Sequence, residues 1–170
     1  MNPFSNQIKD VFPDTVSIGK ARNSALEQLS ETEFPSPQQE IWKYSKIFNL
    51  DLESLNPSFN SPDDKKTEPS FLDIKDSGLI SINDGWLGNP KSGDFLDSSQ
   101  GYLGSLANMG NELSHIEENF DKPKDFFDCL NRAYNPETLV IHVPDGVRHE
   151  SPIYIKIQSV TSGLVACPRI

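Results

Sequence analysis

Apolar residues recur at helical spacing near the start of the chain. Between residues 17 and 31 they fall at steps of three and four, which places them along one side of a helix. The residues of this stripe are Ile18, Ala21, Ala25 and Leu29. The pattern predicts an amphipathic helix over residues 17–31, preceded by a flexible leader over residues 1–16.

A second helix start follows shortly afterwards. Ser36 can cap a helix, Pro37 suits the first helical position, and Gln39 stands three residues after the serine. This arrangement is typical of a capping box, in which the first and fourth residues bond each other's backbone. It predicts a short helix over residues 36–49.

The middle of the chain alternates polar, proline-containing stretches with short apolar ones. Residues 56–70 hold three prolines among polar side chains and predict a linker or a surface loop. Residues 79–87 predict a strand, an Asn-Asp-Gly turn and a returning strand, which together make a small β-hairpin. Residues 103–120 repeat apolar positions at helical spacing and predict a helix, and a shorter helix is predicted over residues 121–133.

From residue 138 the pattern is that of strands. Residues 139–143 are a compact β-rich run, residues 144–146 a Pro-Asp-Gly turn, and residues 152–157 alternate isoleucine with other side chains. Residues 164–166 predict a last strand. So few strands cannot bury both faces of a sheet, and the last one leaves an open edge. We therefore expect the chain to be the front part of a longer protein.

Composition narrows the class of protein. The chain has 170 residues, of which 35% are hydrophobic, and a formal net charge of -10. This is enough for a domain with a core, and the acidic balance argues against nucleic acid as a partner. No stretch approaches the ~18 apolar residues of a membrane span, and the first residues do not resemble a secretory signal. With two cysteines, the sequence predicts a cytoplasmic protein with reduced thiols.

Candidate metal ligands are sparse. The histidines are His115, His142 and His149. The last two flank a predicted turn and could face each other with Cys167 as a third ligand, but the commoner alternative is a strand surface and a loop. Cys129 is expected to be a small buried core residue, and neither cysteine has a visible base partner. The sequence therefore assigns no catalytic, cofactor-binding or metal residue, and predicts no cofactor in this chain.

Residues 40–44, with the sequence Glu-Ile-Trp-Lys-Tyr, are the densest cluster of large and charged side chains. A carboxylate and two aromatic rings could form a ligand pocket. The commoner explanation is that Trp42 and Tyr44 anchor the segment to a neighbour, while Glu40 and Lys43 form an exposed ion pair.

Three stretches together resemble the amino-terminal part of the SufD family, a branch of the SufB/SufD family. They are residues 22–26 with 34–35 and the Glu-Ile-Trp-Lys-Tyr-Ser block at 40–45; residues 82–87; and residues 126–133, 139–147, 151–153 and 168–170. The order and spacing of the third group are similar to the point at which that family enters its β-helix.

The resemblance implies an α+β fold. A helical amino-terminal region with a small β-hairpin, residues 17–137, would be followed by the first strands of a right-handed parallel β-helix, residues 138–170. The resemblance also implies a non-enzymatic scaffold or accessory subunit of iron–sulfur cluster assembly, with SufB and SufC as partners. The family's cluster- and iron-related residues would lie beyond residue 170, so none is transferred to this chain.

Two alternatives come from other functional classes. The chain could be a free-standing acidic adaptor that pairs with a partner through its last strands. It could also be a β-helix hydrolase of polysaccharides, although that function would call for a signal peptide and clustered aspartates on the strands. We expect no enzymatic activity.

Overall fold

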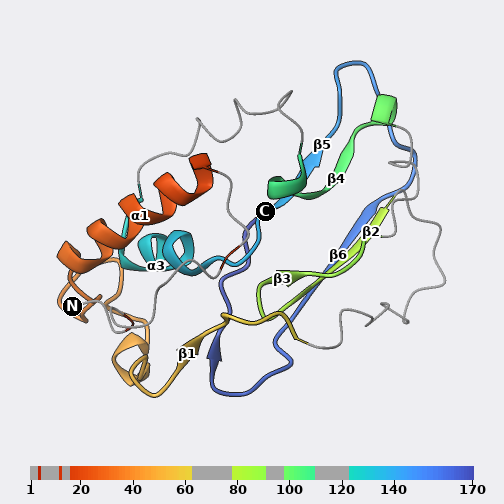
Figure 1. Cartoon of the computed structure of the whole chain (residues 1–170). Helices are drawn as coiled ribbons and strands as arrows, with labels where there is room; N and C mark the ends of the chain where they lie inside the picture. The colour runs from red at the N-terminus through yellow and green to blue at the C-terminus, as the bar shows by residue number, and fades with distance from the viewer. Residues whose placement is uncertain (1–3, 5–11, 13–15, 63–77, 91–97, 110–122) are drawn as a thin grey trace.

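The computed structural model describes residues 4, 12, 16–62, 78–90, 98–109 and 123–170. The α-helices of these ranges are α1 (Val16–Glu31) and α3 (Phe126–Tyr134). The strands are β1 (Asn56–Pro57), β2 (Gly78–Asn83), β3 (Trp86–Leu87), β4 (Tyr102–Ser105), β5 (Leu139–His142), β6 (Ile153–Gln158) and β7 (Leu164–Val165). Short 3₁₀ turns lie at η1 (Ile47–Asn49), η3 (Ser98–Gln100) and η4 (Leu106–Asn108). The two helices lie side by side, and the longer strands gather beyond them (Figure 1).

The helix predicted over residues 17–31 is confirmed as α1. Its buried positions, Arg22, Ala25 and Leu29, recur at steps of three and four, so one face of the helix is buried. The predicted helix over residues 121–133 is confirmed in its second half as α3. The Asp125 carboxylate caps α3 by accepting a hydrogen bond of 2.9 Å from the backbone N–H of Asp128.

The helices enclose an aromatic core. It contains the buried residues Phe4, Ala25, Leu29, Leu52, Phe126, Cys129, Leu130, Ala133, Tyr134 and Cys167. Phe4 belongs to the predicted leader, and its ring centroid lies 5.2 Å from that of Tyr134. Val16, the last residue of the predicted leader, begins α1, and apart from Phe4, Phe12 and Val16 the leader falls outside the described residues.

The strands form three small sheets. In the largest, of order β3-β2-β6, β2 pairs in parallel with β6 from Gly78–Ile153 to Asn83–Gln158 and antiparallel with β3. β4 pairs antiparallel with β5, and β1 pairs in parallel with β7. A second core lies between the largest sheet and the β4–β5 pair, and it contains Ile80, Ile82, Leu87, Leu103 and Leu139.

The hairpin over residues 79–87 and the strands over residues 139–143, 152–157 and 164–166 are confirmed. Each strand after residue 138 pairs with a strand that precedes it in the chain, so this part is neither a self-contained sheet nor a helix. The predicted domain boundary between residues 137 and 138 stays a prediction, and these strand pairs cross it.

The helix predicted over residues 36–49 is wrong. The backbone N–H groups of Gln39, Trp42 and Ser45 bond to carbonyls three residues earlier, which gives a series of tight turns ending at η1. The Gln39 side chain does accept a bond from the Ser36 N–H, at 3.4 Å, but no α-helix follows this half of the capping box. Isolated helices of this length are marginal without a continuous buried face, and this segment lacks one.

The helix predicted over residues 103–120 is wrong for its described part, residues 103–109, and the remainder lies outside the described residues. Leu103 pairs with Ile141 across the β4–β5 ladder and is buried in the strand core. Leu106 begins η4 instead of continuing a helix. The spacing of three residues between Leu103 and Leu106 is compatible with a helix and also with a strand followed by a turn. The pairing of residues 102–105 with β5 makes this segment a strand.

The loop predicted over residues 56–70 is wrong at its start. Asn56 and Pro57 pair in parallel with Leu164 and Val165, and Ser58 is buried. Residues 63–70 lie outside the described residues. A proline can occupy a strand when its missing N–H is not needed in the ladder, so the prolines here do not exclude a strand.

Candidate functional site

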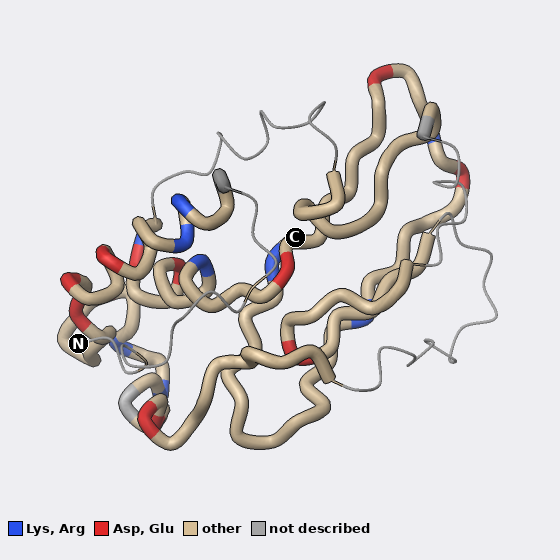
Figure 2. The backbone as a smooth tube through the Cα atoms, in the orientation of Figure 1, with Lys and Arg blue, Asp and Glu red and all other residues tan. Residues whose placement is uncertain are grey.

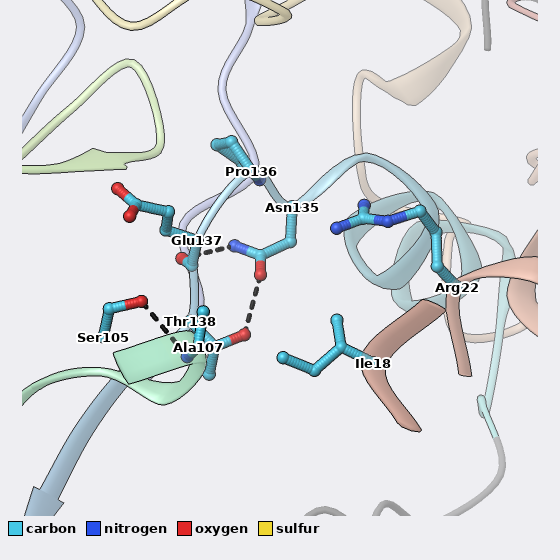
Figure 3. Close-up of a pocket in the computed structure, with 8 residues that line it drawn as sticks. All are labelled: Ile18, Arg22, Ser105, Ala107, Asn135, Pro136, Glu137 and Thr138. Atoms are coloured by element: carbon cyan, nitrogen blue, oxygen red, sulfur yellow. Dashed lines mark hydrogen bonds between the residues drawn. The ribbon is translucent and has the colours of Figure 1, made fainter. Parts of the chain in front are cut away.

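Residues 135–138, Asn-Pro-Glu-Thr, connect α3 to β5 and form a hydrogen-bonded junction. Asn135 follows the last helical residue and is 5% exposed. Its amide nitrogen donates to the carbonyls of Glu137 at 2.9 Å and Cys167 at 2.8 Å. Its amide oxygen accepts from the Thr138 hydroxyl at 2.8 Å (Figure 3). All the hydrogen-bonding groups of this buried amide except one lone pair are therefore used.

Neighbouring bonds attach three further segments at or beside this junction. The Glu137 carboxylate accepts the Leu87 N–H of β3 at 2.9 Å, and the Leu106 N–H of η4 donates to the Thr138 carbonyl at 2.9 Å. The Arg22 guanidinium of α1 donates to the Ala133 carbonyl near the end of α3 at 2.8 Å. Together with the bond to Cys167, these contacts make residues 135–138 the meeting point of the helices, the strands and the carboxyl-terminal segment.

A small pocket lies at this junction, between α1 and η4 (Figure 3). Its lining comprises Ile18, Arg22, Ser105, Ala107, Asn135, Pro136, Glu137 and Thr138. Most of its polar groups already bond the chain itself: Ser105 accepts the Ala107 N–H at 3.3 Å, as a cap of η4. The arrangement fits a structural junction better than a binding site for a small molecule.

The turn between β2 and β3 holds a buried carboxylate. Asp84 is 1% exposed, with a φ of 52°, and its Oδ1 accepts the N–H groups of Val160 at 2.8 Å and Thr161 at 3.4 Å. Burial raises the pKa of this carboxyl, but the hydrogen bonds from Val160 and Thr161 and the hydroxyl of Ser159 outweigh it, so the pKa is lowered. Its second oxygen, Oδ2, is buried without a hydrogen bond. Asp84 thus holds the β6–β7 connection against the hairpin.

The cysteines are buried and reduced. Cys129 lies in α3, as predicted, and is 3% exposed, while Cys167 is 4% exposed. Burial raises the pKa of the Cys167 thiol to about 12 and also raises that of Cys129. Both thiols are therefore protonated at neutral pH in this conformation, which makes them poor nucleophiles and poor metal ligands.

The hypothetical metal site of His142, His149 and Cys167 does not form. His142 lies on β5 opposite Tyr102, and the Nε2 of His149 is 2.8 Å from the carbonyl of Gln100. Cys167 belongs to the aromatic core instead. Within the described residues, His, Cys, Asp and Glu side chains nowhere gather as a group of three or more that could ligate a metal ion, and His115 lies outside that part of the chain.

The turns of residues 40–44 present two large apolar side chains to solvent. Ile41 is 77% exposed and Tyr44 is 87% exposed. Trp42 instead packs its ring 5.4 Å from that of Phe127, so one of the two predicted aromatic anchors is confirmed. Lys43 lies 3.9 Å from the Glu40 carboxylate, as predicted, although the two residues lie in turns.

Charged residues do not gather in one region. Acidic and basic positions are scattered along the helices and the loops of the described chain (Figure 2). On α1 the basic residues Lys20 and Arg22 precede the acidic residues Glu27 and Glu31.

On α3, Arg132 forms an ion pair with Asp128, with an N–O distance of 3.0 Å. Burial raises the pKa of Asp128, but the hydrogen bonds from the Arg132 side chain and the Lys124 backbone N–H, together with the positive charges of Arg132 and Arg169, outweigh it, so the pKa is lowered.

The junction of residues 135–138 was missed as a site by sequence reasoning. The Asn-Pro pair indicated only the end of a helix. Arg22 offered a second signal, because a charged residue within an otherwise apolar helical stripe requires a buried partner. Neither signal identifies which distant carbonyl the side chain reaches.

Comparison with known proteins identifies the family of this chain. Residues 4–155 match the family described as SufBD protein N-terminal region. The chain belongs to this family. Its resemblance to SufB/SufD proteins, inferred from the sequence, is thereby confirmed at the level of the SufBD family.

A similar protein is Protein ABCI7, chloroplastic, from Arabidopsis thaliana. It is 25% identical over 174 residues, which cover 95% of this chain and 36% of that protein. The chain therefore spans about a third of the length of this relative. Among the described residues of this SufBD-family chain, neither α1 nor α3 has the length and apolar content that crossing a bilayer requires.

Proposed function

We propose that this chain is the amino-terminal part of a SufD-type subunit that supports iron–sulfur cluster assembly. The match of residues 4–155 to the SufBD N-terminal region carries this proposal. The Glu-Ile-Trp-Lys-Tyr-Ser block at residues 40–45 favours the SufD branch, because the resemblance of this block is to SufD proteins. The subunit acts as a scaffold or accessory protein and has no active site of its own in this chain.

The proposal includes a β-helix that begins within residues 138–170. Two observations support it: β6 lies parallel to β2 over six residue pairs, and β1 lies parallel to β7. Thr138 and Arg169 form a further parallel bridge. Parallel strand pairing is what the stacked coils of a parallel β-helix require.

The partners proposed are SufB and SufC, in the cytoplasm. Free, buried thiols at Cys129 and Cys167 fit a reducing compartment. The plant relative is named chloroplastic, so cell fractionation is needed to test the location.

The function is tested by co-expressing the full-length protein with SufC and either SufB or SufD, and measuring the mass of the purified complex by light scattering. A SufD-type subunit gives a heteromeric complex that contains SufB, and deletion of its gene lowers the activity of iron–sulfur enzymes in the cell. Assembly with SufD but not with SufB would instead indicate a SufB-type subunit. A protein that joins neither, with iron–sulfur enzymes unaffected by the deletion, would overturn the proposal and favour an independent adaptor.

The β-helix is tested by hydrogen exchange on the full-length protein. If a further coil covers β6, the amides of Ile153–Gln158 exchange as slowly as those of Ile82 and Asn83, which pair with β3 on one side and β6 on the other. If β6 stays an edge strand, its outward-facing amides exchange faster than those of Ile82 and Asn83. The second result would overturn the β-helix without affecting the partner experiment.

A further inference from the structure

The dipeptide Asp-Gly occurs twice in the chain, and the two copies lie in opposite surroundings. Asp84-Gly85 forms the turn between β2 and β3, and Asp145-Gly146 lies in the connection between β5 and β6. Both glycines have a positive φ, 91° at Gly85 and 81° at Gly146. One chemical reaction can therefore be compared at a buried and at an exposed position of the same fold.

In an Asp-Gly pair the aspartate side chain can react with the backbone that follows it. The amide nitrogen of the glycine attacks the carboxyl carbon Cγ of the aspartate, and because glycine has no Cβ this close approach is unhindered. A C–N bond forms, the amide proton is lost and one carboxyl oxygen leaves as water, which closes a five-membered succinimide ring.

Water then opens the succinimide at one of its two carbonyl carbons. Cleavage of the bond between the nitrogen and Cγ restores aspartate. Cleavage of the bond between the nitrogen and the former backbone carbonyl carbon gives isoaspartate, in which the chain runs through Cβ and Cγ. The water lost on ring closure is regained on opening, so the mass is unchanged and the reaction needs neither an oxidant nor a reductant.

The surroundings of Asp145-Gly146 permit this reaction. Both residues are exposed, and a Cβ built on Gly146 would have no atom within 4 Å. The backbone hydrogen bond across the turn runs from the Val147 N–H to the Pro144 carbonyl, at 3.1 Å. The connection projects beyond the strands (Figure 1), and Val143 at its start is 41% exposed. This turn can therefore open locally without separating the strand core.

The surroundings of Asp84-Gly85 oppose the same reaction. Asp84 is 1% exposed, and its Oδ1 accepts the N–H groups of Val160 at 2.8 Å and Thr161 at 3.4 Å. Gly85 is buried as well, and a Cβ built on it would lie 2.9 Å from the ring of Pro136. Ring closure here requires the carboxylate to leave its two donors, and hydrolysis requires the hairpin to admit water.

We propose that Asp145 is a modification site at which the chain forms isoaspartate spontaneously, and that the fold protects Asp84 from the same change. The product has one additional methylene in the backbone of the β5–β6 connection and carries its free carboxylate on Cα. An isoaspartyl carboxylate is the substrate class of repair carboxyl methyltransferases, so the modified turn becomes a methyl acceptor. This assignment does not depend on the function proposed above.

The test ages the folded full chain at physiological temperature and pH in water enriched in oxygen-18, so that each succinimide that opens leaves a heavy oxygen in the chain. Trypsin in ordinary water then releases residues 133–148, whose sole aspartate is Asp145, and residues 76–91, which contain Asp76 and Asp84. Electron-transfer fragmentation identifies and locates isoaspartate in each peptide. We expect at least about ten-fold more isoaspartate at Asp145 than at Asp84, because the reaction at Asp84 waits for the hairpin to open.

The matched control is the same chain aged in denaturant, where no fold protects either pair. Isoaspartate should then form at Asp84 and Asp145 at rates within about three-fold of each other. Asp145→Glu keeps the charge but would have to close a less favourable six-membered ring, so the isomer of the 133–148 peptide should disappear. Equal accumulation at the two aspartates of the folded chain, or none at Asp145 under conditions in which the unfolded chain forms it, refutes the assignment.

Discussion

Replacing Asn135 with alanine should lower the free energy of unfolding by about 2–4 kcal/mol. The substitution removes three hydrogen bonds of 2.8–2.9 Å, to Glu137, Cys167 and Thr138. Each bond contributes roughly 0.5–1.5 kcal/mol net, and each buried partner left unpaired costs about 1–3 kcal/mol. Because Asn135 also lines a pocket open at the surface, water can satisfy part of what is lost, which argues against the upper extreme of the sum.

The matched control is Asn131→Ala. Asn131 is also an asparagine of this region, and its amide nitrogen makes one bond of 3.0 Å, to the Pro168 carbonyl. It lies inside α3, where alanine improves helix propensity by a few tenths of a kcal/mol, so the expected loss is under about 1 kcal/mol. Asn135 lies beyond the last helical residue and gains no such compensation.

Urea unfolding followed by circular dichroism at 222 nm and by tryptophan fluorescence provides the measurement. The difference between the two alanine variants should be at least about 1 kcal/mol, with similar denaturant slopes. If Asn135→Ala is within about 0.5 kcal/mol of wild type, or no less stable than Asn131→Ala, then the hydrogen bonds of Asn135 do not hold α3 and the carboxyl-terminal segment together.

Three other predictions use the same denaturation assay. Because the folded pKa of Asp84 is lowered, its negative charge stabilises the fold above the unfolded pKa of about 3.9, and this stabilisation is lost as pH falls through the folded pKa. Wild type should therefore lose more free energy of unfolding than Asp84→Asn between about pH 5 and pH 2. Equal losses in the two proteins would contradict this. Gly85→Ala should lower the free energy of unfolding by about 2–4 kcal/mol, because Gly85 has a φ of 91° and a Cβ there would lie 2.9 Å from the ring of Pro136. The control Gly146→Ala, at a φ of 81° with no atom within 4 Å of the added Cβ, should cost about 1 kcal/mol. Equal losses would show that the close contact at Gly85 is relieved. Trp42→Ala should lower the free energy of unfolding by about 1–3 kcal/mol, because the Trp42 ring packs against Phe127. Tyr44→Ala should cost less than about 0.5 kcal/mol, because the Tyr44 side chain is exposed. The reverse order would refute Trp42 as the anchor of this segment.

Elements that bury one face on a regular period could be predicted from the sequence. α1 follows its stripe because Ala25 and Leu29 are both buried, and β6 follows its alternation because Ile153 and Ile155 pack on the strand core. The hairpin was also predictable, since its turn residues Asp84 and Gly85 both adopt the positive φ that such a turn needs.

Elements decided by distant pairing could not be predicted. Leu103 and Leu106 satisfy a helical step, but the partner that makes residues 102–105 a strand lies almost forty positions later, in β5. Pro57 suggested a loop, and only the position of β7 makes it part of a sheet. A local pattern limits the conformations of such segments, and tertiary contacts choose among them.

The candidate site also depends on distant contacts that the local sequence does not indicate. Nothing in the local sequence of Asn135 indicates that its amide reaches the Cys167 carbonyl, 32 residues away. The sequence indicated that Asn135 lies at the end of a helix. In the structure, Asn135 also holds the carboxyl-terminal segment against that helix end through its bond to the Cys167 carbonyl.

The position of this junction bears on how the proposed β-helix is attached to the rest of the molecule. If residues 17–137 were an independent domain, few contacts would cross residue 138. Instead, β5, β6 and β7 pair with strands from before that residue, and the Cys167 side chain belongs to the helical core. A force or a fluctuation that separated the strands would also break the bonds of Asn135, so the two parts should unfold together in one transition. In the full-length protein, the amino-terminal helices would then act as a rigid start for the stack of coils, and a coil added to β6 would stabilise α1 and α3 as well.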